Sequence, residues 1–531
     1  MPAGAIPAAR GTVYAQIHHV RHSRSVLARV SAPVVQLARP VLRSRRGVVS
    51  CGSPVATSAG VEMLQAGGTA VDATVAAALV LGVASPHACG IGGDAMILVG
   101  GRGGETTAIN GNGAAPDGVP PEIPPDGGGT AAVPGFVAGL LEAHERFGRL
   151  PREQIFAPAA RLAADGFAVG EQLLAALDRQ RERLQRSSTG WPLLEPTIRL
   201  GSIVRLPRLG ELLLAIGREG SAAFYVGPAA AAVADAVQSD GGAMTTGDLQ
   251  SYSALVRAPV TAKFAGAEIE LSPPVSQGIL LLMALRSLAR LTSSAVSKPE
   301  RLELQVRAIE GSFAYRGEVA RADAEDRLLT DPLPGDLSRE PSAGAKPRAY
   351  NHTAAVTVAD ASGQVVSALV SVFDDFGSAT YVPELGFHLN SRMLGFGEDG
   401  PNAPRRGRRP VHTLAPALVR TPDRLIGIAT PGADGQVQTL LQVLCRVLED
   451  DIPLQLALHQ PRWRLVGDEV LVEQGFDPGL IEELELHGRA VRILPAGDQL
   501  FGAVSAVVAP IDGSALQAMS DPRGESWAAV A

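Results

Sequence analysis

A threonine at the boundary between an irregular segment and a strand hairpin is the feature that most constrains this chain. Residues 351–380 read NHTAAVTVADASGQVVSALVSVFDDFGSAT. Alternating apolar residues follow Thr353, Ser362-Gly363 forms a turn, and a second alternating run returns to Ser371. If the peptide bond before Thr353 breaks, its hydroxyl becomes a nucleophile and its own amino group a general base. The hairpin therefore predicts a self-cleaving precursor of an amide-cleaving enzyme.

A glycine-rich turn leads into a predicted helix in the C-terminal part of the chain. Thr430–Gly435 precedes a segment whose apolar residues Val437, Leu440, Leu441, Leu444 and Leu448 share one helical face. Backbone N–H groups at such a helix start are free to receive negative charge. Paired with a nucleophilic Thr353, this turn would suit an oxyanion hole.

Charge and hydropathy limit the partners of the chain. The net charge is −7 and the pI is near 5.9, which gives no reason to expect nucleic acid or an anionic membrane as partner. No stretch reaches the roughly 20 apolar residues of a membrane span. Residues 1–46 lack the apolar run of a secretory signal and are predicted to be a loosely ordered extension. We therefore expect a cytoplasmic protein.

The three cysteines are too few and too scattered for a disulfide framework, and we expect buried free thiols at Cys51, Cys89 and Cys445. No Cys/His spacing resembles a zinc site. The sequence implies neither a metal nor an organic cofactor.

The N-terminal half opens with recognisable local signals. A strand is expected at Gly47–Cys51, and Thr69 with Asp72 three residues later predicts a capped helix start. The glycine-rich turn His87–Asp94 precedes a strand at Ala95–Val99, which is the wrong order for a phosphate loop. A close-packed turn beneath another backbone is the preferred interpretation.

Several long segments resemble one family in order along the chain. Gly47–Asp94 resembles the opening segment of the γ-glutamyltransferase family. Four further stretches resemble later segments of the family: Ala131–Pro151, Ala157–Phe167, Met244–Tyr252 and Ser520–Arg523. The resemblance implies an α+β fold, a four-layer αββα sandwich of the N-terminal-nucleophile hydrolase type. It also implies one precursor that cuts itself into two intertwined subunits. The implied parts are the extension 1–46, a large subunit 47–352 and a small catalytic subunit 353–531.

Catalytic roles follow from the same resemblance. The cut would fall between His352 and Thr353, and Thr353 would be acylated by substrate. Its α-amino group, with an ordinary pKa of about 7.7–8.0, suits proton transfer near neutral pH. Ser371 matches the hydroxyl that hydrogen-bonds the nucleophile. Gly432 and Ala433 match paired glycines whose N–H groups hold the oxyanion, and alanine keeps that N–H.

The substrate clamp of the family is altered here. An arginine that holds the glutamate α-carboxylate is replaced by Asn112, before Ala115-Pro116. The groups that receive the α-amino group map to Phe373 and to Leu394-Gly395, and a serine pair maps to His412-Thr413. An asparagine cannot replace the charge of a bidentate arginine. These changes argue against glutathione as the preferred substrate.

The replacements are similar to one branch of the family. GIGGD, LNSRMLGF, RRPVHTLAP and TPGADGQVQT resemble the glutathione-hydrolase-like branch, which itself resembles oxamate amidohydrolases and acylases that remove glutaryl-type groups. By that resemblance Arg392 would grip a substrate carboxylate, with His412 nearby. Asp94 and Asn112 would either line the pocket or form turns.

The leading hypothesis is a self-processed zymogen of two subunits, an amidohydrolase or acyltransferase acting on a small N-acyl or carboxylate-bearing amide. Alternatives are a γ-glutamyl hydrolase or transferase acting on glutathione-like compounds, and a hydrolase that breaks a C–C bond beside a keto group in a natural-product pathway. An unprocessed, inactive scaffold is a further alternative, because Ala354 and Ala355 replace the usual Thr-His after the nucleophile. The expected partners are the substrate, the two subunits themselves and further copies of the heterodimer.

Overall fold

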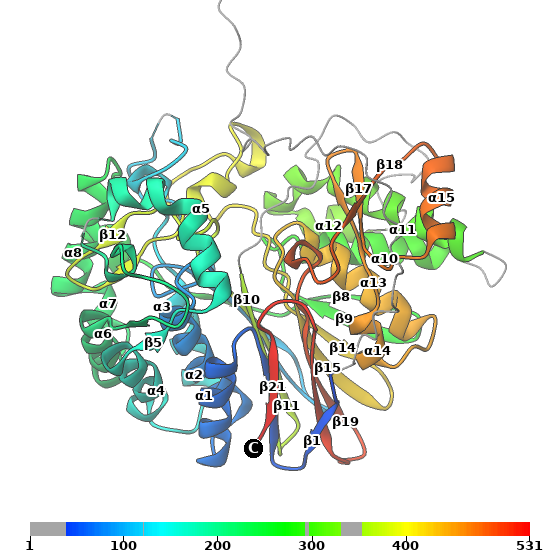
Figure 1. Ribbon diagram of the computed structural model, residues 1–531, viewed down its shortest axis with the longest axis horizontal. Helices are drawn as coiled ribbons and strands as arrows, with labels where there is room; N and C mark the ends of the chain where they lie inside the picture. The colour runs from blue at the N-terminus through cyan, green and yellow to red at the C-terminus, as the bar shows by residue number, and fades with distance from the viewer. Residues whose placement is uncertain (1–38, 121, 189, 292–296, 331–352) are drawn as a thin grey trace, which may run out of the picture. The chain divides into compact units, whose positions relative to one another are not determined.

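Two seven-stranded sheets lie face to face, and each carries helices on its outer face (Figure 1). The computed structural model describes residues 39–120, 122–188, 190–291, 297–330 and 353–531. The two sheets contact each other through β2, β10 and β11 on one side and β15, β19 and β20 on the other. The predicted four-layer αββα sandwich is thereby confirmed.

The first sheet is antiparallel throughout and interleaves strands from both sides of Thr353. Its order is β21 (Trp527–Val530), β2 (Gly47–Cys51), β10 (Ala354–Asp360), β11 (Gln364–Ser371), β3 (Asp94–Gly101), β4 (Thr107–Gly111) and β7 (Leu255–Arg257). The predicted strand at Gly47–Cys51 and the predicted hairpin are confirmed.

The second sheet is also antiparallel. Its order is β1 (Leu42–Ser44), β20 (Leu516–Ser520), β19 (Ser505–Pro510), β15 (Arg424–Ala429), β14 (Ala417–Arg420), β9 (Ala267–Leu271) and β8 (Val260–Phe264). Strand β1 belongs to the segment 1–46 that was expected to be loosely ordered. Because β1 pairs with β20, regular structure begins before Gly47; residues 1–38 of that segment lie outside the described residues.

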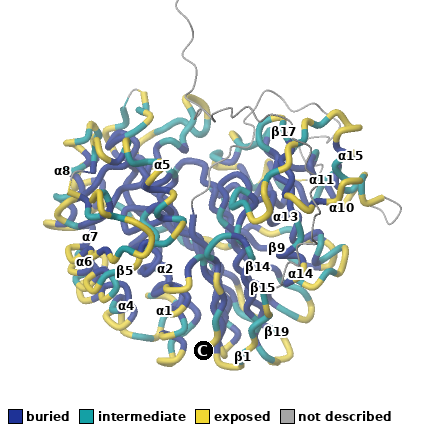
Figure 2. Tube along the Cα trace, in the orientation of Figure 1, coloured by how far each residue is buried: buried dark blue, intermediate teal, exposed yellow. Residues whose placement is uncertain are grey.

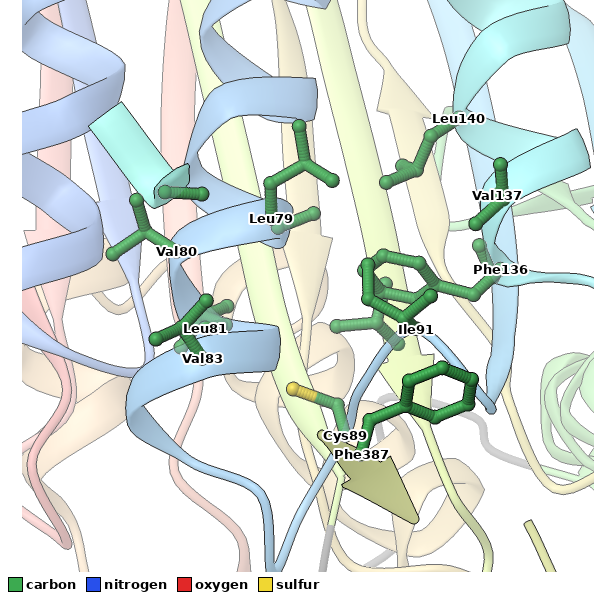
Figure 3. Close-up of a cluster of buried hydrophobic side chains, with 14 of the residues drawn as sticks. Leu79, Val80, Leu81, Val83, Cys89, Ile91, Phe136, Val137, Leu140 and Phe387 are labelled. Carbon is green, nitrogen blue, oxygen red and sulfur yellow. The ribbon is translucent and has the colours of Figure 1, made fainter. Parts of the chain in front are cut away.

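Helices α1 (Pro54–Gln65), α2 (Ala70–Ala84) and α3 (Phe136–Phe147) cover the first sheet. Helices α10 (Gly278–Leu291) and α13 (Gly435–Leu448) pack on the second, and α11 (Lys298–Phe313) packs against α10. Helix α2 is apolar on all sides because it lies between β10, β11 and three other helices. Figure 3 shows Leu79 of α2 in one apolar cluster with Ile91, Phe136, Leu140 and Phe387. Figure 2 shows that the central strands are buried throughout.

The remaining elements lie around this frame. The other helices are α4 (Arg152–Asp165), α5 (Glu171–Ser187), α6 (Pro207–Glu219), α7 (Ala222–Tyr225), α8 (Gly227–Ser239), α9 (Thr246–Gln250), α12 (Ala324–Leu329), α14 (Leu454–His459) and α15 (Pro478–Leu486). A three-stranded sheet contains β16 (Trp463–Val466), β17 (Glu469–Glu473) and β18 (Ala490–Leu494). Two-residue strands form two further pairs, β5 (Phe167–Ala168) with β6 (Ile203–Val204) and β12 (Tyr381–Val382) with β13 (Phe387–His388). None of the helices in the described part of the chain combines the length and apolar character needed to cross a membrane.

The predicted cap of α2 is confirmed. Thr69 Oγ1 accepts the N–H of Asp72, and the Asp72 carboxylate accepts the N–H of Thr69 at 2.8 Å. The same buried carboxylate also accepts the N–H groups of Arg149 and Leu150. The cap therefore ties the start of α2 to the segment that follows α3.

Replacing Asp72 by alanine is expected to lower the free energy of unfolding by about 3 kcal/mol, because it leaves several backbone donors without an acceptor. Chemical denaturation measures the change. Glu62→Ala, which removes an exposed ion pair with Arg161, is the matched control and is expected to cost less than about 1 kcal/mol. Equal effects of both variants would contradict the role of the cap.

The cysteines are free and buried, as predicted. Burial raises the pKa of Cys51 to about 12, and it raises the pKa of Cys89 and Cys445 as well. These thiols stay protonated near neutral pH and are poor nucleophiles. Within the described ranges no group of three or more His, Cys, Asp or Glu side chains is placed to hold a metal ion.

Candidate active site

Four of the predicted site residues lie in one row across four neighbouring strands. Ser371 of β11 is paired directly with Asp94 of β3. The register between β10 and β11, continued by one residue, places Thr353 opposite Ser371. The register between β3 and β4, continued likewise, places Asn112 opposite Asp94. Opposed residues of antiparallel strands project from the same face, so these four side chains gather at one end of the sheet.

The row faces the gap between the two sheets. Two positions along the strands from this row, Ala355, Leu369 and Met96 pack with Leu414 and Ala429 of the second-sheet side in one small apolar cluster. Side chains alternate along a strand, so the row points in the same direction as this cluster. The residues that adjoin Leu414 and Ala429 in the chain therefore lie opposite the row.

The turn that leads into β3 brings Asp94 beside Ser371. A Cβ atom on Gly93 would stand 2.2 Å from the carbonyl oxygen of Ser371, and one on Gly92 would stand 2.3 Å from that of His388. Only glycine allows such close passage of two backbones. The prediction of a close-packed turn beneath another backbone is confirmed.

The two hydroxyls of the hairpin are in contact. Thr353 Oγ1 donates to Ser371 Oγ at 3.4 Å, and Ser371 Oγ accepts the N–H of Phe373 at 3.0 Å. Thr353 is 8% exposed and borders a cavity of about 50 Å³, which Pro431 and Glu525 also line. Ser371 is thus fixed in contact with the hydroxyl of Thr353. His352 lies outside the described residues.

The predicted oxyanion donors occupy the turn between β15 and α13. Gly432 has φ 122° and Ala433 has φ 51°, so an alanine occupies a left-handed position that favours glycine. The carbonyl oxygen of Ala433 accepts from Gln277 Nε2 at 3.1 Å. Among the described residues neither N–H of this pair donates to another group. Pro431, the residue before this pair, lines the cavity of Thr353, so the turn that carries the two predicted donors borders that cavity.

Asp94 and Arg392 form a fully buried ion pair. Arg392 Nε donates to Asp94 Oδ2 at 2.7 Å, and Gly113 N–H donates to Asp94 Oδ1 at 2.6 Å. Burial alone would raise the pKa of Asp94, but the neighbouring Arg392 charge holds that pKa below its usual value. The carboxylate is therefore ionised and fixes the guanidinium.

Two nitrogens of Arg392 remain available. Nη1 and Nη2 are buried and contact no hydrogen-bond acceptor among the described residues. The ring of Phe373 covers one face of the guanidinium, with 4.5 Å from Cζ to the ring centroid. Nη1 and Nη2 therefore form an edge of two donors without an acceptor, and a buried donor without an acceptor favours the binding of an anion.

His412 completes this cluster as a neutral side chain. Its Nε2 lies 3.5 Å from Asp94 Oδ2, and its Nδ1 accepts the N–H of Leu414 at 3.0 Å. The hydrogen of the neutral ring therefore belongs on Nε2. Burial and the nearby Arg392 charge lower the pKa of His412 to about 4. Thr413 is buried beside it, and its carbonyl oxygen accepts from Gln277.

Asn112 has a mainly structural set of contacts. Its Nδ2 donates to the backbone carbonyl oxygen of Pro410 at 3.1 Å, and the backbone carbonyl oxygen of Asn112 accepts from the hydroxyl of Tyr252 at 2.7 Å. Its Oδ1 is buried without a hydrogen-bond partner among the described residues. Asn112 therefore closes one end of the row and offers a neutral acceptor there.

A larger cavity of about 330 Å³ adjoins the cluster on the side of Phe373. Phe373 and Val411 line it together with Arg316, Leu394 and Phe396. Phe373 has φ 82°, an uncommon conformation for an aromatic residue that has to be held by its surroundings. This side chain stands between the cavity and the guanidinium of Arg392.

Sequence reasoning missed Gln277 and Asn390. Gln277 Nε2 bridges the carbonyl oxygens of Thr413 and Ala433, which joins the two segments of the second half that face the row. Asn390 accepts the N–H of Arg392 and donates to Gly92. The Leu-Asn pair before Arg392 was a visible signal for Asn390. Gln277 had no local signal.

Acid is expected to weaken the fold through two buried histidines. Burial lowers the pKa of His388 to about 3 and that of His412 to about 4, whereas both take a proton near pH 6.5 once unfolded. Unfolding therefore takes up protons below that pH, and stability is lost as the pH falls. At pH about 5 the loss is about 2 kcal/mol for each histidine.

Thermal unfolding followed from pH about 7 to about 5 measures this effect. The His388→Gln variant is expected to lose less stability over that range than the unchanged protein. A melting temperature that stays constant over the range would contradict neutral buried histidines.

Comparison with known proteins decides the family. The family model described as Gamma-glutamyltranspeptidase matches residues 56–531. This chain belongs to the γ-glutamyltranspeptidase family. It is 31% identical over 524 residues to the oxamate amidohydrolase proenzyme of Klebsiella pneumoniae, covering 92% of this chain and 98% of that protein. It is 28% identical over 477 residues to the glutathione hydrolase proenzyme of Bacillus subtilis, covering 78% of this chain and 80% of that protein.

A solved structure supports the same assignment. The cephalosporin acylase from Bacillus halodurans superimposes with a TM-score of 0.83 at 25% sequence identity, covering 95% of this chain and 99% of that one. Like other members of the γ-glutamyltranspeptidase family, this chain is an enzyme, a self-processing amidase or acyltransferase of the N-terminal-nucleophile hydrolase class. The predicted family resemblance is confirmed. The subunit boundaries 47–352 and 353–531 and the cytoplasmic location remain predictions.

Proposed function

We propose that the chain cuts itself between His352 and Thr353 and then transfers a carboxylate-bearing acyl group from a small amide to water or an amine. The observation that carries this proposal is the row in which Thr353 contacts Ser371 and Ser371 is paired with Asp94, the partner of Arg392. One end of the row supplies a nucleophile. Asp94, two strands away, holds a cation with two donors that meet no acceptor among the described residues.

The reaction uses groups already described. The α-amino group of Thr353 takes the proton of its own hydroxyl as Oγ1 bonds to the amide carbon. Ser371 orients that hydroxyl, and the N–H groups of Gly432 and Ala433 hold the negative oxygen of the tetrahedral intermediate. The C–N bond then breaks and the amine leaves with the proton. Water or a second amine attacks the resulting ester and regenerates Thr353.

The acyl group is proposed to end in a carboxylate. A carboxylate can take both Nη1 and Nη2 of Arg392 in a bidentate contact, and the neutral His412 adds an Nε2–H donor beside it. A dicarboxylic monoamide carries an amide for Thr353 at one end and a carboxylate for Arg392 at the other.

The same contacts disfavour a γ-glutamyl group as the preferred acyl group. Its α-ammonium needs an acceptor, but the positions that supply one in the family are Phe373, Leu394 and Gly395 here. Asn112 carries no charge and its amide already contacts Pro410. These residues leave the α-ammonium group without a charged partner, which costs binding free energy.

A set of p-nitroanilides tests the substrate class. Oxalyl, succinyl, glutaryl, γ-glutamyl and valeryl anilides are compared by kcat/KM, with valeryl as the uncharged control of similar length to glutaryl. We expect at least one dicarboxylic anilide to exceed the valeryl compound by about 100-fold and to exceed the γ-glutamyl compound. Highest turnover of the γ-glutamyl anilide, or no preference for the carboxylate, would overturn the proposal.

Denaturing electrophoresis with N-terminal sequencing tests the processing step. We expect two fragments, the smaller beginning at Thr353. A single full-length species without turnover of any anilide would identify an inactive scaffold. A fragment that begins at another residue would remove Thr353 from the mechanism.

A further inference from the structure

Arg464 of β16 is a buried cation directly behind the predicted oxyanion loop. Its side chain is among the largest that are almost fully buried. A Cβ atom on Gly435 would stand 2.6 Å from both Cζ and Nη1 of Arg464, and one on Gly432 would stand 3.5 Å from Nη1. The guanidinium therefore packs against Gly435, where only the lack of a Cβ atom makes room for it, and it lies close to Gly432 in the same turn.

A second loop of the same cavity is held by Arg464. Its Nη1 donates to the carbonyl oxygen of Leu500, in the short helix η6 (Gln499–Phe501). Gln499 and Ala503 line the cavity that contains Thr353 and Pro431. One guanidinium thus joins two backbone segments that border the candidate nucleophile.

The oxyanion loop needs such support. Ala433 occupies a left-handed conformation, which costs free energy for a residue with a Cβ atom and persists only when its surroundings fix it. Gln277 holds the carbonyl oxygen of Ala433, and Arg464 packs against the glycines on either side of the Ala433-Asp434 pair. Together they determine where the two N–H groups point.

We propose that Arg464 is a positioning residue for the oxyanion site. It fixes the Gly432 and Ala433 amides, and its buried charge lies beside the place where the carbonyl oxygen becomes negative. A charge held in a water-poor site acts more strongly than the same charge in solvent, and it acts on the tetrahedral state more than on the neutral substrate. This inference rests on the proposed function, because it requires acyl transfer at Thr353.

The neighbouring arginines have a different task. Arg462 and Arg523 are buried in ion pairs with Asp521 and Glu473, which link α14, β17 and the chain after β20. Their removal would leave buried carboxylates unpaired and destabilise the fold. Arg464 differs from them because its guanidinium packs against the loop of the candidate site.

Kinetics of Arg464→Met and Arg464→Lys test the inference, measured on processed protein with the best anilide. We expect Arg464→Met to lower kcat about 10- to 100-fold while KM changes less than about threefold. Arg464→Lys keeps the charge, and its kcat is expected to be at least about fivefold higher than that of Arg464→Met. Arg492→Met removes an exposed arginine paired with Glu469 on neighbouring strands and is expected to leave kcat unchanged.

A boronic acid that bears the preferred acyl chain gives a second measurement, because it forms a tetrahedral adduct with the nucleophile. Its Ki is expected to rise in parallel with the loss of kcat/KM in Arg464→Met. The role of Arg464 would be overturned by unchanged kcat or unchanged Ki in Arg464→Met, or by an equal loss of kcat in the lysine and methionine variants. If Arg464→Met does not process, Arg464→Lys decides: a partial loss of kcat with a parallel rise in Ki supports the role of Arg464, whereas unchanged values, or a loss as large as that expected for methionine, overturn it.

The two proposals can fail separately. Failure of the proposed function would appear as missing processing of the wild-type protein, or as activity that does not depend on Thr353. Failure of the Arg464 inference would leave both intact.

Discussion

Replacing Thr353 by alanine is expected to leave a single full-length chain without measurable amidase activity. The alanine has neither the hydroxyl that attacks the preceding carbonyl nor the one that attacks substrate, so both steps are lost together. A loss of at least about 1,000-fold in kcat/KM is expected for a covalent nucleophile. Electrophoresis reports the processing and anilide hydrolysis reports the turnover.

Thr353→Ser is the matched control for this change. Serine keeps the hydroxyl and, after cleavage, the adjacent amino group, so both fragments and a reduced turnover are expected. Ser371→Ala removes only the hydroxyl at 3.4 Å from Thr353 Oγ1 and is expected to slow both steps by about 10- to 100-fold. Two normal fragments and normal turnover from Thr353→Ala would end the proposed mechanism.

Replacing Arg392 by glutamine is expected to remove the preference for a carboxylate in the acyl group. The ratio of kcat/KM between the best dicarboxylic anilide and the valeryl anilide should fall about 100-fold, because the bidentate contact is lost. The valeryl anilide itself should change less than about threefold after correction for folded protein. Arg392→Gln also leaves the buried Asp94 unpaired and should cost about 3–5 kcal/mol of stability.

The double variant Asp94→Asn with Arg392→Gln separates the two effects. It removes both buried charges, so stability should largely return while the carboxylate preference should not. A double variant that still prefers the carboxylate would show that Arg392 serves only the fold. Arg420→Gln, which removes an ion pair with Glu270 in the second sheet, is the control for a general effect of losing an arginine.

The sequence was sufficient for the hairpin and the layers but not for the full row. Strand alternation and the Ser362-Gly363 turn predict a hairpin that runs from Thr353 to Ser371, and the structure agrees. The contact between the two hydroxyls was implied only by the family resemblance. The pairing of Ser371 with Asp94 joins segments far apart in the chain, and no local pattern carries such a register. The resemblance placed both residues in the site without showing that they are neighbours.

Side chains that act through packing were the hardest to predict. Arg464 and Gln277 reach the oxyanion loop only because β16 and the start of α10 are brought beside it in the folded chain. For Asn112, pocket lining and a structural role were equally open, and its contacts with Pro410 and Tyr252 now favour the structural role. Burial also explains why His412 is neutral, which its sequence neighbours did not indicate.

The strand order of the first sheet has a consequence for what the cut can release. Strands β10 and β11 follow the predicted cleavage point, yet β2 and β3, which precede it, flank them on both sides. Scission before Thr353 would therefore free an amine without freeing a polypeptide, since the fragments share one uninterrupted ladder of backbone hydrogen bonds. Neither fragment has a complete sheet of its own. Two fragments expressed from separate genes should therefore assemble only when they fold in each other's presence.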